Sequence, residues 1–257
     1  MKKIHLITGA SSGMGMEFVR QLKGSVNDEE FWLIARRKEK MEALLRQEGL
    51  RGRAFGLDLT QTESFQEIKQ ALALEDVRII TLVNAAGYGK IGDFKDISEK
   101  DALGMVDLNC RALLAITKLS LPYLVRGSVI YQFASVAAFL PQPYFAVYAA
   151  GKAFVLSFSR ALNQELKRYG IQVVAICPNP VETEFFQRAG VEKEVNLIKK
   201  IGMEPKEKVV ATAIKRAKRG KDISISHYTA KTIYLISRLL PHGFVLRMEE
   251  KFLRSKV

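Results

Sequence analysis

The sequence predicts an α/β fold with a doubly wound parallel sheet and helices on both faces, in a single domain spanning residues 1–257. Apolar segments rich in β-branched residues alternate with segments of helical periodicity, which is typical of repeated strand–helix–strand units. The apolar segments are nearly continuous, as expected for parallel strands covered on both faces. The length of 257 residues fits one α/β domain, and no Pro-, Gly- or Ser-rich linker divides the chain.

The expected strands and helices follow one another along most of the chain. The strands are residues 3–8, 31–35, 53–57, 79–84, 127–135 and 171–177. The helices are Glu17–Gly24, Lys38–Glu48, Thr62–Leu74, Ala102–Val125 and Tyr148–Tyr169, with a shorter one over Lys206–Arg219. This order predicts a Rossmann-like layered architecture, in which ligands bind at the carboxyl ends of the strands.

Composition and segment lengths exclude several classes of protein. Cys110 and Cys177 lie far apart and outside any metal-binding spacing, so neither a disulfide framework nor a metal site is expected. A Gly/Ser-rich turn interrupts the N-terminal apolar run before it reaches the length of a signal-peptide core. No apolar stretch is long enough to span a membrane. We therefore expect a cytoplasmic protein, in contact with a membrane at most at its surface.

The positive charge is concentrated toward the C-terminal end. The formal net charge is +13, and residues 193–257 hold 16 Lys and Arg against 6 Asp and Glu. A clustered basic region can meet nucleic acid, an anionic membrane surface or an acidic protein, and it can equally be a solvated face. The sequence lacks a helix-turn-helix pattern and the aromatic-basic interleaving of an RNA-binding surface, which disfavours nucleic acid as the partner.

A glycine-rich turn follows the first strand and leads directly into a helix. Its ligand-facing candidates are Gly9, Ser11, Ser12, Gly13, Met14 and Gly15. Glycines allow a tight turn and a close approach of the backbone to a ligand. The N-terminus of the helix offers unpaired N–H groups and partial positive charge to a pyrophosphate. The turn therefore predicts a dinucleotide-binding site.

A tyrosine and a lysine four residues apart form the candidate catalytic pair. Tyr148 and Lys152 share one helix face, so the ammonium of Lys152 is expected close to the phenol. A positive charge there favours the phenolate and lowers the pKa of Tyr148 toward the range useful for acid–base catalysis. Ser135 ends an apolar strand thirteen residues before the tyrosine, at the edge where a parallel sheet faces its ligand.

The TGxxxGxG spacing of the turn, with a serine thirteen residues before a YxxxK pair, resembles the short-chain dehydrogenase/reductase family. The resemblance implies hydride transfer between a nicotinamide and a carbonyl or alcohol carbon. It implies that Ser135 stabilises the substrate oxygen, that Tyr148 delivers the proton during reduction, and that Lys152 binds the nicotinamide ribose and tunes the tyrosine. Asn109 matches the family's fourth catalytic residue, whose backbone helps to hold a water that links the lysine to solvent.

The same resemblance implies further cofactor contacts. An aspartate after the third strand matches the residue placed against the adenine, and an NNAG-like motif after the fourth strand lines the cofactor site and stabilises the sheet. A motif after the sixth strand ends on a threonine for the nicotinamide carboxamide. The residues are Asp58, Leu59, Asn84, Ala85, Ala86, Gly87, Pro178, Val181 and Thr183. Asn179 stands where the family usually has glycine, and asparagine tolerates positive φ better than most residues.

Two arginines follow the second strand. Arg36 and Arg37 come directly after Ala35, which stands where NAD-preferring members of the family commonly carry an acid. An acid binds the ribose 2′-hydroxyl and repels a 2′-phosphate, whereas an arginine accommodates the phosphate. We expect NADPH (NADP) as the cofactor, with Arg36 as the first candidate and Arg37 as the second. The alternative is that both belong only to the basic first turn of a helix.

The expectations about the substrate rest on the C-terminal third of the chain. Residues 184–208 carry apolar side chains and are the expected substrate lid, which indicates an apolar substrate unless they only pack on the sheet. Residues 230–257 form an apolar and basic C-terminal appendage that caps the pocket, packs at a subunit interface or lies on a membrane. The resemblance implies a homodimer or homotetramer formed through the helices 102–125 and 148–169.

Three functions are therefore weighed. The first is an NADPH-dependent carbonyl reductase or alcohol dehydrogenase acting on a lipid-, steroid- or acyl-like substrate. The second is a 3-oxoacyl-thioester reductase, for which basic residues near the cleft would meet an acidic acyl carrier protein. The third is a dinucleotide-sensing or nucleic-acid-binding protein on the same fold, which the complete set of candidate catalytic residues disfavours.

Overall fold

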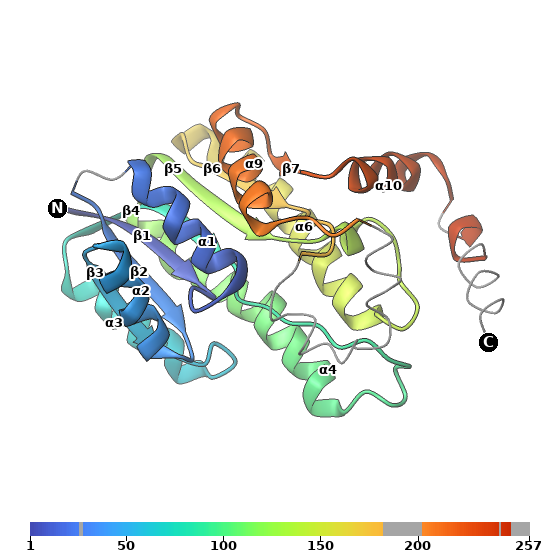
Figure 1. The fold of residues 1–257 in the computed structure, drawn as a ribbon, viewed down its shortest axis with the longest axis horizontal. Helices are drawn as coiled ribbons and strands as arrows, with labels where there is room; N and C mark the ends of the chain where they lie inside the picture. Colours follow the sequence, from blue (N-terminus) through green and yellow to red (C-terminus); the bar gives the residue numbers. More distant parts are fainter. Residues whose placement is uncertain (26–27, 182–201, 242, 248–257) are drawn as a thin grey trace.

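One parallel sheet forms the centre of the molecule (Figure 1). A computed structural model describes residues 1–25, 28–181, 202–241 and 243–247. Within these residues the sheet has seven strands in the order β3-β2-β1-β4-β5-β6-β7. They are β1 (Lys2–Thr8), β2 (Glu30–Ala35), β3 (Gly52–Gly56), β4 (Val77–Asn84), β5 (Leu124–Phe133), β6 (Gln172–Ile176) and β7 (Ile223–Ser224). The predicted doubly wound parallel sheet is confirmed, and the short edge strand β7 adds to the six predicted strands.

Within the described residues the helices are α1 (Gly13–Leu22), α2 (Lys38–Glu48), α3 (Thr62–Leu74), α4 (Glu99–Val106), α5 (Leu113–Ser120), α6 (Ala146–Leu166), α9 (Lys206–Lys218) and α10 (Tyr228–Leu239). Helices α2 and α3 have the bounds that the sequence predicts. Helix α1 begins earlier than its apolar periodicity indicates, because the glycine-rich turn itself forms its first residues.

The predicted helix over residues 102–125 is wrong in its interior and at its end. A π-helical segment, Asp107–Ala112, separates α4 from α5. After Ser120 the chain forms a short 3-10 turn containing Pro122 and then enters β5 at Leu124. Proline lacks the backbone N–H that a continuing α-helix requires, which accounts for the early end.

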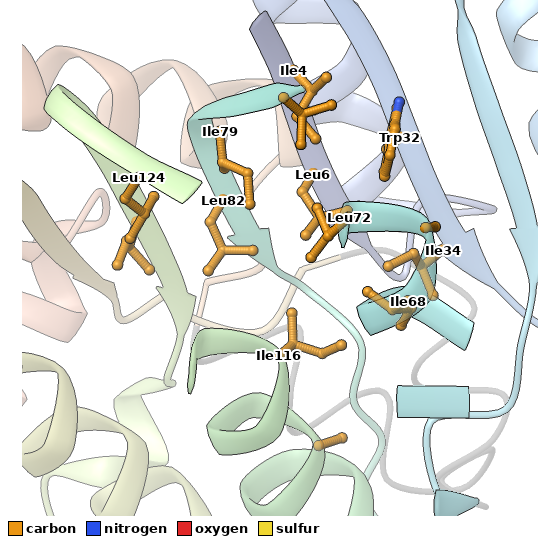
Figure 2. Close-up of a cluster of buried hydrophobic side chains, with 14 of the residues drawn as sticks. Ile4, Leu6, Trp32, Ile34, Ile68, Leu72, Ile79, Leu82, Ile116 and Leu124 are labelled. Atoms are coloured by element: carbon orange, nitrogen blue, oxygen red, sulfur yellow. The ribbon is translucent and has the colours of Figure 1, made fainter. Parts of the chain in front are cut away.

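Helices cover both faces of the sheet and bury two separate apolar clusters. Helices α1, α2 and α9 contribute Phe18, Met41 and Val210 to one cluster, and α3, α5 and α6 contribute to the other. Figure 2 shows the second cluster, with Ile4, Leu6, Trp32, Ile34, Ile68, Leu72, Ile79, Leu82, Ile116 and Leu124 labelled. Full burial of one such side chain contributes about 1.5–3 kcal/mol. The sheet is therefore a rigid base for the groups at its carboxyl edge.

The strand order reverses between β1 and β4. From β1 the sheet extends to β2 and β3 on one side and to β4 through β7 on the other. The last residues of the two central strands, Thr8 and Asn84, are direct neighbours in the sheet. In open α/β sheets a crevice for ligands forms outside the carboxyl ends at such a reversal.

Helix α10 packs against the rest of the protein through one small apolar cluster. Ala230 is fully buried in a cluster with Phe139 and Ile225, and the Tyr234 ring packs against Phe139 with 4.9 Å between centroids. Figure 1 shows α10 at one end of the molecule, apart from the helices that cover the sheet. Within the described part of the chain, no helix combines the length and the apolar character needed to cross a bilayer.

Candidate active site

The glycine-rich turn lies tightly against the end of β4. Gly9 has a φ of +68°, and a Cβ built on it would lie 2.8 Å from the backbone of Ala85 and Ala86. A Cβ on Gly15 would lie 2.5 Å from the Gly9 carbonyl oxygen. Both positions therefore exclude any side chain, and α1 begins directly at the crevice.

The N-terminus of α1 is open toward this crevice. Ser12 is the N-cap residue, but its side chain makes no capping hydrogen bond, and the first turn of α1 holds no acidic residue. The N–H groups and the positive end of the helix dipole are thus free to meet an anion. The turn with Gly13 and Met14 fits the pyrophosphate of a dinucleotide, as the sequence predicts.

Thr8 joins the turn to the next strand, a role that the sequence analysis missed. Its Oγ1 accepts hydrogen bonds from the backbone N–H of Ala85 at 3.1 Å and of Ala86 at 3.2 Å. The hydroxyl therefore fixes the loop that follows β4. The only sequence signal is the threonine before Gly9, which is too common a residue to indicate a contact 77 positions away.

Asn84 faces the interior of the protein beneath the site. Its Nδ2 donates to Thr117 Oγ1 and to Gln132 Oε1, both at 3.0 Å, and Gln132 Nε2 donates to the same Thr117 oxygen. All three side chains are buried. This network ties β4, β5 and α5 together, in agreement with the sheet-stabilising role that the resemblance implies. Thr117 and Gln132 carry no sequence signal for it.

The candidate groups for the adenosine end lie around the ends of β2 and β3. Arg37 is half-buried and donates from Nε and one terminal nitrogen to Ser11 Oγ at 3.3 and 3.2 Å, whereas Arg36 is exposed. The Asp58 carboxylate accepts from the backbone N–H and the hydroxyl of Thr60, and Leu59 is buried in the core. The second-choice arginine is thus the one that reaches the glycine-rich turn.

Ser135 and Tyr148 meet at the carboxyl edge of the sheet. Ser135 lies two residues after the end of β5, and its hydroxyl accepts from the N–H of Ala137 at 3.2 Å. Tyr148 lies in the first turn of α6, stacked on Phe145 with 4.2 Å between ring centroids. Burial raises the pKa of Tyr148 to about 12, and a hydrogen bond with the Ser135 hydroxyl acts in the opposite direction.

Lys152 lies one turn further along α6 and is almost fully buried. Its Nζ donates to the Phe133 carbonyl oxygen at 2.6 Å and lies 5.5 Å from the centre of the Tyr148 ring. Burial lowers the pKa of Lys152 to about 8. The sequence predicts that Lys152 lowers the pKa of Tyr148, whereas in the structure burial raises this pKa. Desolvation dominates both groups, and the ammonium is directed to a backbone carbonyl.

Asn109 lies in the π-helical segment and is buried beside Lys152. Its Oδ1 accepts from the Tyr88 N–H at 3.1 Å, and its Nδ2 donates to the Tyr88 carbonyl at 2.8 Å. A Cβ on Gly87 would lie 2.7 Å from Asn109 Oδ1 and 3.6 Å from Lys152 Nζ. The side chain of Asn109 thus fixes the loop after β4. The π-helical segment, frequently found at functional sites, could not be recognised from periodicity.

The loop after β6 completes the described part of the site. The Pro178 carbonyl accepts from Val136 N–H at 3.0 Å, next to Ser135. Val181 pairs with Glu204 in an isolated parallel bridge. Among the described non-glycine residues positive φ occurs at Tyr144, so Asn179 does not use the left-handed conformation considered for it. Thr183 and most of the predicted lid, residues 184–201, lie outside the described residues.

The fold and these groups define a dinucleotide-binding α/β protein with a serine, a tyrosine and a lysine gathered beside the nucleotide crevice. The model of the short chain dehydrogenase family matches residues 3–194, and the chain belongs to this family. It is an NAD(P)-dependent oxidoreductase.

Three comparisons place the chain within the family. Serine 3-dehydrogenase of Agrobacterium fabrum is 32% identical and aligns over 86% of this chain and 90% of its own length. A very-long-chain 3-oxoacyl-CoA reductase of Neurospora crassa is 30% identical over 65% of this chain and 53% of its own. The structure of a short-chain dehydrogenase from Sphingobium yanoikuyae in complex with NADPH has a TM-score of 0.77 and 26% identity, and covers 100% of this chain and 96% of that one.

Proposed function

We propose that the protein is an NADPH-preferring reductase that interconverts a carbonyl and an alcohol on an apolar substrate. The observation that carries the proposal is the hydrogen bond between the Ser135 and Tyr148 hydroxyls at the carboxyl edge, with Lys152 one helical turn away. The glycine-rich turn fits a dinucleotide on the same edge. The four proposed catalytic residues are Asn109, Ser135, Tyr148 and Lys152.

The chain's own residues supply the acid–base chemistry. When bound, the reduced nicotinamide supplies the hydride. Ser135 donates a hydrogen bond to the substrate oxygen and stabilises the negative charge that develops there. Tyr148 is protonated at neutral pH, because burial raises its pKa to about 12, and it transfers this proton to the same oxygen.

Lys152 and Asn109 restore the proton. Lys152 Nζ lies 5.5 Å from the centre of the Tyr148 ring, and its ammonium is the proposed source of the proton that replaces the one lost by Tyr148. Burial lowers the pKa of Lys152 to about 8, so the lysine can exchange a proton near neutral pH. The segment around Asn109 links this group to solvent through water. A phenol that is neutral at rest supports reduction as the working direction.

The preference for NADPH rests on the end of β2. Arg37 extends across the glycine-rich turn to Ser11, and Arg36 stands exposed beside it. Position 35 holds an alanine, so no acidic side chain at this position repels a 2′-phosphate. We place Arg37 before Arg36 as the residue that binds the phosphate, because its guanidinium already lies at the turn.

An apolar substrate is supported by the surroundings of the reactive phenol. Tyr148 belongs to a buried cluster with Met105, Ala137 and Ala149, against which Phe145 packs. Water and strongly hydrated groups are poorly accommodated in such a cluster. We propose residues 184–208 as the lid that covers the substrate.

A 3-oxoacyl thioester is the second candidate substrate. The similarity to a very-long-chain 3-oxoacyl-CoA reductase favours it, although that relative matches over 53% of its own length. The 16 Lys and Arg of residues 193–257 would favour the phosphates of such a substrate.

A substrate screen tests the proposal directly. Ketones, aldehydes, steroids and 3-oxoacyl thioesters are offered with NADPH, oxidation of the cofactor is followed by absorbance, and Tyr148→Phe serves as the blank. We expect turnover of at least one apolar carbonyl compound by the parent protein. Turnover that is equal in Tyr148→Phe contradicts the proposed role of the phenol, and a better rate with NADH contradicts the cofactor assignment.

A further inference from the structure

Helix α10 presents an uncovered apolar face to its surroundings. Tyr228, Leu235 and Leu239 are 73%, 59% and 71% exposed. Their spacing of seven and four residues places them on one side of the helix, opposite the buried Ala230 and the packed Tyr234. Ile236 is also exposed, as are Leu240 and Phe244, which follow the helix. Large apolar side chains exposed together on one helix face are typical of a contact site.

The charges along the same segment have one sign. Residues 228–247 contain Lys231, Arg238 and Arg247 and no Asp or Glu. All three basic residues are exposed, and none forms an ion pair with another described residue. Lys231 and Arg238 are spaced seven residues apart, so they lie on one side of α10.

We propose that this face of α10 docks the protein on an anionic membrane surface. The helix has 12 residues, too few to span a bilayer, so it would lie in the plane of the interface with its apolar side among the lipids. Basic residues beside an apolar helix face add electrostatic attraction to anionic headgroups. A second copy of the chain docked through the same face is the less suitable occupant, because its residues 228–247 would bring Lys231, Arg238 and Arg247 and no acid to meet the same basic residues.

The inner side of α10 connects the docking face to the active site. Tyr234 packs on Phe139. Phe139 directly follows the 3-10 turn Val136–Ala138, whose N-cap residue is Ser135. Asn179 Nδ2 donates to Thr229 Oγ1 at the start of α10. A docked α10 thus holds the carboxyl edge of the sheet near the bilayer, where apolar compounds concentrate. The benefit for turnover rests on the proposed function, whereas the docking does not.

Vesicle flotation tests the docking without any substrate. The Tyr148→Phe protein is mixed with vesicles of phosphatidylcholine alone or with phosphatidylglycerol added. We expect binding to the anionic vesicles, weakening as salt rises, and little binding to phosphatidylcholine. The double variants Leu235→Ser/Leu239→Ser and Lys231→Gln/Arg238→Gln should each bind the anionic vesicles at least about tenfold more weakly.

Matched surface variants and the oligomeric state complete the experiment. Leu74→Ser removes an apolar side chain that is 85% exposed on α3, and Arg46→Gln removes an exposed charge on α2, so both should bind vesicles like the parent. Equal binding to both vesicle types, or no binding, overturns the proposal. It is also overturned if Leu235→Ser/Leu239→Ser lowers the mass in light scattering while vesicle binding stays unchanged, since the face is then an interface between copies. Loss of vesicle binding together with normal folding by circular dichroism supports the proposal.

Discussion

Burial shifts the proton affinities of the two central catalytic candidates in opposite directions. The pKa of Tyr148 is raised to about 12 and that of Lys152 is lowered to about 8, because the low-polarity interior disfavours the charged form of each. At neutral pH the tyrosine is therefore a neutral donor, and the lysine is close to its own titration. Proton transfer through these residues is expected to depend on pH near neutrality.

Lys152 should make the stability of the protein rise with pH between 8 and 10. In this window the unfolded chain keeps the lysine proton, up to a pKa of 10.5, whereas the folded chain has released it. Because the unfolded state then binds more protons, the free energy of unfolding increases with pH, by at most about 1.4 kcal/mol per pH unit. Urea unfolding at several pH values measures this slope.

The variant Lys152→Met isolates the contribution of the lysine. Tyr148 and Cys177 are present in both proteins, and burial, which the substitution keeps, is the main cause that raises the pKa of each to about 12. The charge of Lys152 lowers the pKa of Cys177 only as a smaller cause. The free energy of unfolding of the parent minus that of the variant should therefore increase from pH 8 to 10. A difference that stays constant over this range would show that Lys152 is not desolvated.

Arg37 should determine the selectivity between the two nicotinamide cofactors. A charge-assisted hydrogen bond contributes about 1.5–3 kcal/mol, so Arg37→Ala should lower kcat/KM with NADPH by about ten- to hundredfold. The value with NADH should change little, because NADH has no 2′-phosphate. Steady-state kinetics with both cofactors measure the effect, and Arg46→Ala, on helix α2, whose N-cap residue is Arg37, is the control. If Arg36→Ala alone abolishes the preference, the order of the two arginines is reversed.

At the scale of elements, the loop after β6 is held by side chains from distant parts of the chain. The N–H of Asn179 donates to Glu204 Oε1 at 2.9 Å, and its Nδ2 donates to the Gly202 carbonyl at 3.2 Å and to Thr229 Oγ1. Glu204 and Asn179 are both buried. A residue that replaces the family's usual glycine thus connects the loop to the segment before α9 and to the N-terminus of α10.

Thr229→Val should weaken cofactor binding, because it removes one of the hydrogen bonds that fix this loop. The lost bond costs about 0.5–1.5 kcal/mol, which corresponds to a rise of about two- to tenfold in the Kd for NADPH if the loop contacts the nicotinamide. Fluorescence titration with NADPH measures it. Thr229→Ser should restore the parent affinity, and Thr232→Val, on the exposed side of the same helix, should leave it unchanged.

The elements that the sequence predicted well are those fixed by local pattern. The bounds of α2 and α3 agree with their apolar periodicity, and the order of Ser135, Tyr148 and Lys152 placed these groups at one edge. The π-helical segment around Asn109 escaped prediction because it shifts the hydrogen bonds without changing the composition. Thr8 and Glu204 escaped as well, since their partners are brought together only by the completed sheet.

At the scale of the whole molecule, α5 and α6 carry apolar residues that face outward. Phe154 is 40% exposed and stacks on Phe158, and Leu114 of α5 is exposed to a similar extent. Burying such residues between subunits removes apolar surface from water. We propose that these helices form the contact of a homodimer or homotetramer.

Phe154→Asp should therefore convert the oligomer to a smaller species. A charged group buried in an apolar interface without a partner strongly disfavours association. Light scattering coupled to size exclusion measures the mass, with Leu74→Asp as an exposed apolar control on α3. A parent protein that is monomeric at all concentrations would refute the assembly, as would an unchanged mass for Phe154→Asp.

Transfer of deuterium tests the central claim most directly. NADPH carrying deuterium at the transferable position of the nicotinamide is supplied with a carbonyl substrate found in the screen, and the alcohol is examined by mass spectrometry and NMR. We predict one deuterium on the carbon that carried the oxygen. The Tyr148→Phe protein should bind NADPH with unchanged Kd and form the labelled alcohol at least about a hundredfold more slowly. An unlabelled alcohol, or label formation by Tyr148→Phe at the parent rate, would contradict the account.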